Sequence, residues 1–194
     1  HRVVVAADPH RLELDVSDFR GPTLEEDLRR RDFTVNAIAI ALEDWLRNPR
    51  EPHPLIDPLE GRSALAGKRL IPCFSGTFEE DPVRILRAFR FVAQLEFAVD
   101  PSAHALMALA IPRHSTVSGE RIRDELLAMF ETDHAHGAVQ SLNDLRVLDV
   151  LCPELIPGRG MEQGGFHHLD VLGHEMETVA QADRILSDFA EFSE

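Results

Sequence analysis

Residues 79–91 constrain the fold and function of this chain more than any other stretch. Pro82 is tolerated in a first helical turn, because the N–H that it lacks would have no partner there. The acidic residues before it place negative charge at the positive end of a helix dipole. Apolar residues then recur at helical spacing, so the stretch predicts a helix with one apolar stripe made of Ile85, Leu86, Phe89, Val92 and Ala93.

The charged face of this predicted helix carries Asp81, Arg84 and Arg87, three residues apart. One carboxylate and two guanidinium groups offer acceptors and forked donors, a set that could read the edge of a nucleobase or hold phosphate. The same spacing also fits an ordinary amphipathic helix whose charged residues are solvated and paired with one another. Spacing alone leaves both interpretations open.

The overall charge limits which partners the chain can have. Its 20 Lys and Arg residues against 34 Asp and Glu residues give a net charge of −14, which argues against a nucleic-acid-binding surface over the whole protein but allows a local basic site. Cys73 and Cys152 show no metal-binding or redox spacing, and no apolar run is long enough to span a membrane. We therefore expect a cytoplasmic protein without membrane association. Because the chain starts without Met and stops in mid-pattern, we also expect a piece trimmed at both ends.

The first 37 residues contain two further candidate groups of polar residues. A β-branched run and an alternating run predict a hairpin, with Asp15 on the polar face of the second strand, where a solvent-facing carboxylate is the ordinary interpretation. A capping box at Thr23 predicts a helix that ends in three arginines, followed by Asp32 and Asn36. This could be an anion-binding patch or a basic helix end followed by turn residues. Residues 38–42 look like a strand.

The second half of the chain predicts helices over residues 101–109, 119–130 and 134–147, and a last helix that ends near residue 192. His168, Asp170 and His174 could ligate a metal, but no second His-Asp pair follows, so we expect no closed metal site. The apolar face of the second of these helices is expected to consist of Ile122, Leu126, Leu127 and Phe130.

Five ordered motifs carry a specific resemblance. Residues 27–37, DLRRRDFTVNA, and residues 80–87, EDPVRILR, resemble the RRDFTxNA and EDxxRxxR motifs of the class II tRNA nucleotidyltransferase and bacterial poly(A) polymerase family. Around them, in the family's order, DFRG at 18–21 looks like the end of the catalytic hairpin, DPLEG at 57–61 like the hinge motif and GERIRDEL at 119–126 like the neck motif.

The resemblance implies template-independent addition of nucleotides to an RNA 3′ end, with Mg²⁺ as cofactor and CTP and ATP as substrates. In this family a DxD pair on a preceding strand holds the metals; that pair is absent from this sequence, and Asp15 matches a third, catalytic and metal-binding carboxylate. The implied nucleotide contacts are Arg31 at phosphate, Asp32 at the ribose, Asp81 and Arg84 at the base edge, with Asn36 nearby and Arg87 steadying the pair or the triphosphate.

We therefore expect an α+β protein. Its expected parts are a partial nucleotidyltransferase head over residues 1–76, a helical neck that binds nucleotide and RNA over 77–157, and the start of a helical body, possibly of HD type, over 158–194. The expected function is CCA addition to the 3′ end of tRNA, with this piece inactive alone. The alternatives are a poly(A) polymerase, an enzyme restricted to CC or A, a non-catalytic RNA-binding module and an HD-type phosphohydrolase.

Overall fold

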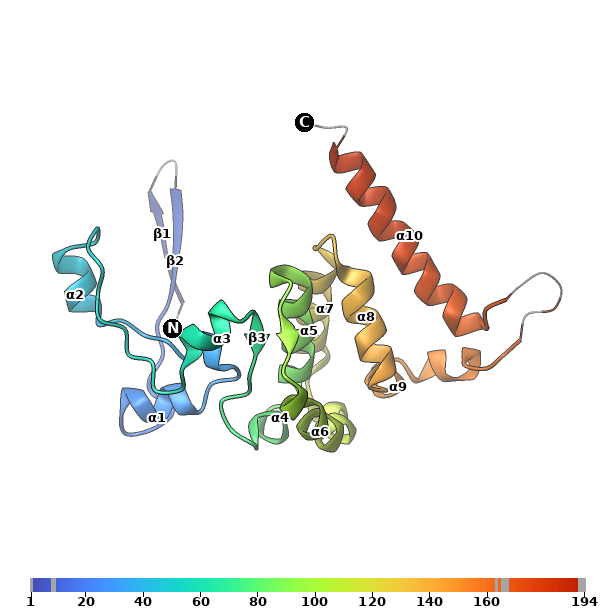
Figure 1. Cartoon of the computed structure of the whole chain (residues 1–194), viewed down its shortest axis with the longest axis horizontal. Helices are drawn as coiled ribbons and strands as arrows, with labels where there is room; N and C mark the ends of the chain where they lie inside the picture. The colour runs from blue at the N-terminus through green and yellow to red at the C-terminus, as the bar shows by residue number, and fades with distance from the viewer. Residues whose placement is uncertain (1, 8–9, 163, 165–167, 192–194) are drawn as a thin grey trace.

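The computed structural model describes residues 2–7, 10–162, 164 and 168–191, and its architecture confirms the predicted α+β class (Figure 1). Helices predominate, and the described strands form two small two-stranded sheets. The elements of the predicted head are β1 (Arg2–Ala7), β2 (His10–Asp15), α1 (Leu24–Arg29), η1 (Thr34–Asn36), α2 (Leu42–Arg47), α3 (Gly61–Ala66) and β3 (Arg69–Leu70). Those that follow are α4 (Thr77–Glu80), α5 (Val83–Leu95), β4 (Ala98–Val99), α6 (Pro101–Ala110), η2 (Ile111–Thr116), α7 (Gly119–Phe130), α8 (Ala135–Asp144), α9 (Leu148–Leu151), η3 (Pro153–Gly158) and α10 (Val171–Glu191).

The predicted N-terminal hairpin is present. β1 and β2 pair antiparallel, with Arg2 opposite Asp15 at the open end and Ala7 opposite His10 near the turn. The hairpin projects away from the helices (Figure 1). Asp15 is the last residue of β2, and its side chain lies outside the described part of the structure. Its predicted metal-binding role therefore stays a prediction.

The helix α1 begins where the capping box predicts. Thr23 has extended backbone angles, and its hydroxyl accepts a hydrogen bond of 3.3 Å from the backbone N–H of Glu26. The strand predicted for residues 38–42 is wrong. Ala39 makes a single bridge to Ile56, and Leu42 already opens α2. The partner Ile56 lies between Pro54 and Pro58, which have no N–H to donate, so the bridge does not extend into a ladder.

The hinge motif fixes α3 against η1. The carboxylate of Asp57 accepts hydrogen bonds from the backbone N–H groups of Gly61 (2.6 Å) and Arg62 (3.0 Å), which are unpaired donors at the start of α3. A Cβ atom on Gly61 would stand 2.1 Å from the carbonyl oxygen of Thr34. Glycine is therefore needed at residue 61, because any side chain would push η1 away.

The helix start predicted around Pro82 is confirmed, and a separate short helix, α4, precedes it. α4 ends at Glu80, Asp81 is extended (φ −148°, ψ 95°), and α5 begins after Pro82. The cause is Pro82, whose ring disfavours helical backbone angles at the residue before it. The apolar stripe itself is confirmed, because Ile85, Leu86, Phe89 and Ala93 are buried and Val92 is partly buried.

The main hydrophobic core lies around α5, which packs against α7 and α8. The apolar face predicted for α7 is partly wrong. Ile122 and Leu126 pack against the core, but the side chains of Leu127 and Phe130 are 54% and 48% exposed. Met129 of the same helix is fully buried and belongs to the core cluster instead.

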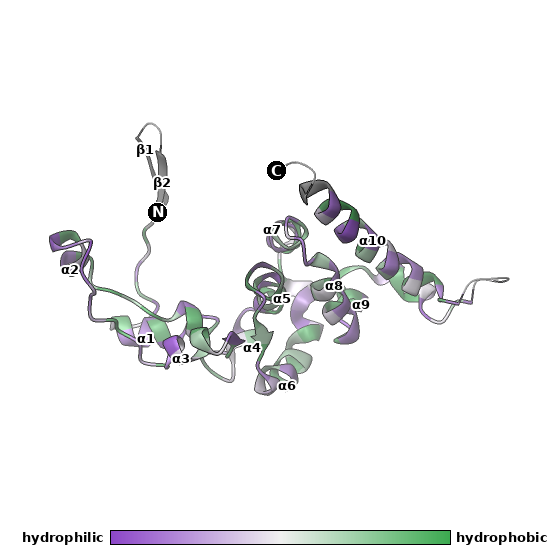
Figure 2. Ribbon diagram, turned by 45° about the horizontal axis from the view of Figure 1, so that its top comes forward, coloured by the Kyte–Doolittle hydropathy of each residue, from purple (hydrophilic) through white to green (hydrophobic). Residues whose placement is uncertain are grey.

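A backbone link joins the predicted head to the neck. β3 pairs in parallel with β4, with Arg69 opposite Ala98 and Leu70 opposite Val99. The last helix, α10, matches its predicted position, and its ribbon alternates between hydrophilic and hydrophobic residues (Figure 2). None of the helices in the described ranges is long and apolar enough to cross a membrane.

Candidate functional site

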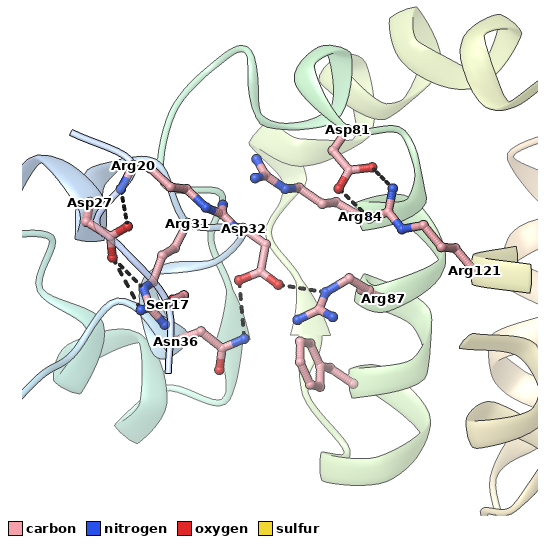
Figure 3. A pocket seen from close by; sticks show the side chains of 11 residues that line it. Ser17, Arg20, Asp27, Arg31, Asp32, Asn36, Asp81, Arg84, Arg87 and Arg121 are labelled. Carbon is pink, nitrogen blue, oxygen red and sulfur yellow. Dashed lines mark hydrogen bonds and ion pairs between the residues drawn. The ribbon is translucent and has the colours of Figure 1, made fainter. Parts of the chain in front are cut away.

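A cavity of about 520 Å³ lies between the α1–η1 segment and the helices α5 and α7 (Figure 3). Five arginines and three aspartates line it, so its lining carries a net charge of +2 although the chain carries −14. This is the kind of local basic site that the composition allowed. The lining residues are Ser17, Arg20, Asp27, Arg31, Asp32, Asn36, Asp81, Arg84, Arg87, Phe91 and Arg121.

Asp32 is a buried carboxylate of the cavity with several hydrogen-bond partners. It is 7% exposed, and one oxygen accepts from the backbone N–H of Phe33 (2.8 Å) and the side-chain amide of Asn36 (3.3 Å). Its other oxygen accepts from Nε of Arg87 at 2.9 Å. The predicted residues Asp32, Asn36 and Arg87 therefore form one hydrogen-bonded chain from the head to α5.

Arg87 is shared between two carboxylates. Its Nη1 donates to Glu125 of α7 at 3.2 Å, and Glu125 also accepts from Nε of Arg90 at 2.6 Å. Burial alone would lower the pKa of Arg87, but the charges of Asp32 and Glu125 outweigh it and raise that pKa above its ordinary value. Arg87 therefore stays cationic, with two edges of its guanidinium held by protein.

Arg31 is held by a carboxylate beneath it. The carboxylate of Asp27 accepts from Nε and Nη2 of Arg31 at 3.4 and 3.3 Å, and from the backbone N–H of Arg20 at 3.0 Å. The side chain of Asp27 is 8% exposed and that of Arg31 is 45% exposed. Arg31 therefore presents a positive charge to the cavity from a fixed base.

Arg84 is almost fully buried, at 5% exposed. Its Nη1 donates to the carbonyl oxygen of Thr77 (3.2 Å) and its Nη2 to that of Arg30 (3.3 Å). Glu80 also lies 3.6 Å from Nη1. Two neutral backbone acceptors thus fix the orientation of this guanidinium.

Asp81 is bonded to Arg121 rather than to Arg84 (Figure 3). The two terminal nitrogens of Arg121 donate to the two oxygens of Asp81, at 3.1 and 2.7 Å. The hydrogen bond and charge of Asp81 outweigh burial and raise the pKa of Arg121 above its ordinary value. The predicted charged face is therefore present, but Asp81 and Arg84 are held by different partners and not by each other.

The structure brings together six predicted residues and adds others that the sequence prediction missed, among them Arg121 in the lining and Glu125 behind Arg87. Arg31, Asp32, Asn36, Asp81, Arg84 and Arg87 all line the cavity. Arg121 and Glu125 had been quoted as part of a motif without a role. Their spacing of four on a predicted helix places them on one face, and that was the available signal.

The described residues contain no cluster of metal-ligating side chains. No group of three or more His, Cys, Asp or Glu residues in the described ranges could hold a metal ion, and the cavity aspartates are bonded to arginines. Asp170 instead caps α10, accepting from the backbone N–H groups of Gly160 (2.6 Å) and Gly173 (2.7 Å). These bonds lower the pKa of Asp170.

The chain matches two family models. Residues 2–71 match the "Poly A polymerase head domain", and residues 96–158 match the "Probable RNA and SrmB- binding site of polymerase A". Among curated proteins, it is 41% identical to the A-adding tRNA nucleotidyltransferase of Deinococcus radiodurans, over 82% of this chain and 36% of that protein. It is 36% identical to the CCA-adding enzyme of Listeria monocytogenes, over 89% of this chain and 42% of that protein.

Solved structures show the same fold. A CCA-adding enzyme in complex with CTP superposes with a TM-score of 0.67 at 28% identity, covering 78% of this chain and 36% of that one. A tRNA nucleotidyltransferase complexed with a primer tRNA and an incoming ATP analog gives a TM-score of 0.65 at 30% identity, covering 77% of this chain and 44% of that one. The chain thus spans well under half the length of these relatives.

Proposed function

The chain belongs to the class II tRNA nucleotidyltransferase and bacterial poly(A) polymerase family, and we propose that it carries the nucleotide-selecting part of an enzyme that adds CCA to the 3′ end of tRNA. The observation that carries the proposal is the cavity, where the family's nucleotide-binding residues converge from the head and the neck. Its local net charge of +2 suits a triphosphate, since the rest of the chain is acidic.

In the proposed mode of binding, Arg31 faces a phosphate and Asp32 accepts a hydrogen bond from the ribose. Arg31 is the more exposed of the two and is free to point its charge outward from Asp27. Asp32 is fixed by its bonds to Asn36 and Arg87, so it needs little reorganisation when the sugar arrives.

Asp81 and Arg84 read the base edge in this proposal. Cytosine and adenine both present an exocyclic amine, which donates, beside a ring nitrogen, which accepts. A carboxylate can only accept and a guanidinium can only donate, so the pair complements C and A. Uracil and guanine present a carbonyl beside a ring N–H, which reverses the pattern and leaves both protein groups unsatisfied.

Mg²⁺ is part of the proposal as the group that activates the 3′-hydroxyl and neutralises the triphosphate. Asp15 is the residue of this chain proposed to contact it. The cavity aspartates are less suited to this role, because each is already paired with an arginine side chain whose positive charge repels a cation.

The test compares CTP, ATP, UTP and GTP incorporation by the full-length protein with that of two variants, Arg84→Ala and Asp81→Asn. We expect the preference for CTP over UTP to fall by about 10- to 100-fold in each variant. This corresponds to the loss of one good base-edge contact, which contributes about 1–3 kcal/mol of discrimination. Asp81→Asn guards against misfolding of the first variant, because Asp81 is more exposed than Arg84. Arg113→Ala, whose side chain is 57% exposed, is the control. An unchanged preference in both variants contradicts the base-reading role.

A restricted enzyme is the second candidate, because the relatives include an A-adding and a CC-adding tRNA nucleotidyltransferase at 41% and 40% identity. Product lengths on tRNAs that end before, within and after CC distinguish these functions. A long adenosine tail would instead indicate a poly(A) polymerase.

A further inference from the structure

We infer that a second cavity, between α8 and α10, binds a nucleoside unit, meaning an uncharged nucleobase with its ribose, taken either from an unpaired stretch of RNA or free in solution. This cavity has a volume of about 340 Å³ and lies on the far side of α8 from the arginine-lined cavity (Figure 1). The volume falls at the lower end of the range for small-molecule sites. The inference goes beyond the proposed function and does not depend on it.

The two helices supply different walls of this second cavity. On α8, His136, Gln140 and Asn143 are spaced by four and three residues, so they share one face of the helix. On α10, Leu172 and Met176 are four residues apart and almost fully buried. Because α8 packs against α10, a polar wall meets an apolar one. A flat ring suits such a site, since its face packs on Leu and Met side chains while its edge bonds to polar groups.

Two buried nitrogens of the lining have no hydrogen-bond partner in the described part of the chain, Nδ1 of His136 and Nε of Arg159. The Nη2 atom of Arg159, in contrast, donates to Asn143 at 2.7 Å and to Asp149 at 2.8 Å. An arginine Nε can only donate, whereas an imidazole nitrogen donates or accepts according to its tautomer. The ligand that satisfies both nitrogens therefore carries at least one acceptor.

The two nitrogens lie at different heights along α8. Arg159 is held at Asn143, and His136 precedes Asn143 by seven residues, which is about 10 Å along the helix. A nucleoside spans such a gap, because the base has acceptors on its edges and the ribose has hydroxyl groups at the other end. Both nitrogens are shielded from water, so binding must turn the two side chains slightly towards the ligand.

The charge of the lining favours an uncharged ligand. It contains one arginine, Arg159, and two acids, Asp170 and Glu177, so its net charge is −1 with His136 left uncounted. The acids already have partners, because Asp170 caps α10 and Glu177 accepts from Gln181 at 2.6 Å. A phosphate at this site would meet two carboxylates. The arginine-lined cavity with its charge of +2 suits a triphosphate, whereas this one suits the phosphate-free part of a nucleotide.

The first experiment measures binding of adenosine, cytidine and their 5′-monophosphates to the full-length protein by saturation-transfer NMR. Saturating CTP is present to occupy the arginine-lined cavity. We expect both nucleosides to bind, and the added phosphate to weaken binding by about threefold or more. In a second arm, a single-stranded RNA that carries 4-thiouridine is cross-linked by ultraviolet light, and the modified peptides are mapped. Cross-links within residues 136–143 or 169–177 identify RNA as a source of the base.

Three variants assign the binding to this cavity. His136→Phe keeps a ring but removes the unpartnered nitrogen, so nucleoside affinity should fall about 5- to 10-fold while the melting temperature stays the same or rises. Gln140→Trp places a large side chain on the α8 wall and should abolish binding. The matched control is His134→Phe, the same change at a side chain that is 61% exposed and outside the lining. Its affinity should equal that of the wild type.

The outcomes are distinct. Nucleoside binding with cross-links in the two segments supports the inference with RNA as a source, and nucleoside binding without such cross-links supports it with the free nucleoside as the ligand. The inference is overturned if no nucleoside or RNA binding is weakened by His136→Phe and Gln140→Trp, since the cavity then holds water only. Equal or tighter binding of the monophosphates overturns it by marking an anion site. An equal loss of affinity in His134→Phe overturns it by placing the binding elsewhere.

Discussion

The segment before residue 67 and the helices after residue 82 form two walls of one cavity, but different forces hold them. The wall formed by the helices after residue 82 is part of the hydrophobic core, in which α5 buries residues such as Ile85 and Leu86 against α7 and α8. Between residues 16 and 66 the buried apolar residues are few, and many large apolar side chains are exposed. The exposed ones are Val16, Phe19, Ile40, Leu42, Trp45, Leu46, Leu55, Ile56 and Leu65.

The wall before residue 67 is instead held in place by the apolar side chain of Phe33 and by hydrogen bonds and ion pairs. Phe33 is fully buried and packs on Phe78 and Phe91 of the neck, with ring centroids 6.2 and 6.0 Å apart. Asp32 directly precedes this anchor and binds Arg87. The wall before residue 67 is therefore positioned by its contacts with the helices after residue 82. A substitution that disturbs those helices should displace both walls of the cavity.

The largest effect is expected from a cavity in the neck core. Leu86→Ala should lower the free energy of unfolding by about 2–5 kcal/mol, because it removes a fully buried side chain from a packed site. Denaturant unfolding measures the loss. Leu109→Ala is the control, since that leucine is 68% exposed on α6 and its truncation should change the stability by less than about 0.5 kcal/mol. Equal losses in the two variants would show that α5 does not carry the core.

A smaller effect is expected when the close packing of α3 on η1 is disturbed. Gly61→Ala forces a methyl group against the Thr34 carbonyl oxygen and should cost about 1–3 kcal/mol, together with weaker CTP binding as η1 shifts. Gly137→Ala has no atom within 4 Å of the added Cβ and lies inside α8. It should be neutral or stabilising by up to about 1 kcal/mol. Calorimetry and CTP titration check both, and wild-type behaviour of Gly61→Ala would contradict the close packing of α3 on η1.

The smallest effect concerns the ionisation of Cys73, which lies where the two walls meet. Burial raises the pKa of the Cys73 thiol from 9.0 to about 12, and the charge of Asp32 adds to the shift. Above pH 9 the unfolded chain loses the thiol proton while the folded chain keeps it, so the free energy of unfolding should fall as the pH rises from 9 towards 12. Urea unfolding at pH 8 and pH 10 measures this.

The control for this pH dependence is Cys73→Ser, which removes the titrating thiol. The variant should lose less stability than the wild type between the two pH values. An identical decline in both proteins would mean that the thiol is not shielded from water in the folded state.

The sequence predicted those parts of the fold that depend on neighbouring residues. Thr23 caps α1 through its own third neighbour, and the apolar stripe of α5 is read directly from its period. Pro82 likewise marks the start of α5, because its ring favours extended backbone at Asp81. The exposure of Leu127 and Phe130 was not predicted, because it depends on which side of α7 meets the rest of the core.

The sequence also determined which residues form the candidate site, since six predicted side chains line one cavity. Only the tertiary structure decided their partners: Arg121 for Asp81, two backbone carbonyls for Arg84, and Glu125 beside Asp32 for Arg87. The physical reason is that helix periods and caps act over a few residues, whereas a charged side chain binds the best-placed of several acceptors. These partners lie 38 to 55 residues away for Arg87 and 40 residues away for Asp81. Packing of α5 against α7 brings Glu125 and Arg121 within reach, and packing of Phe33 on Phe91 of α5 brings Asp32.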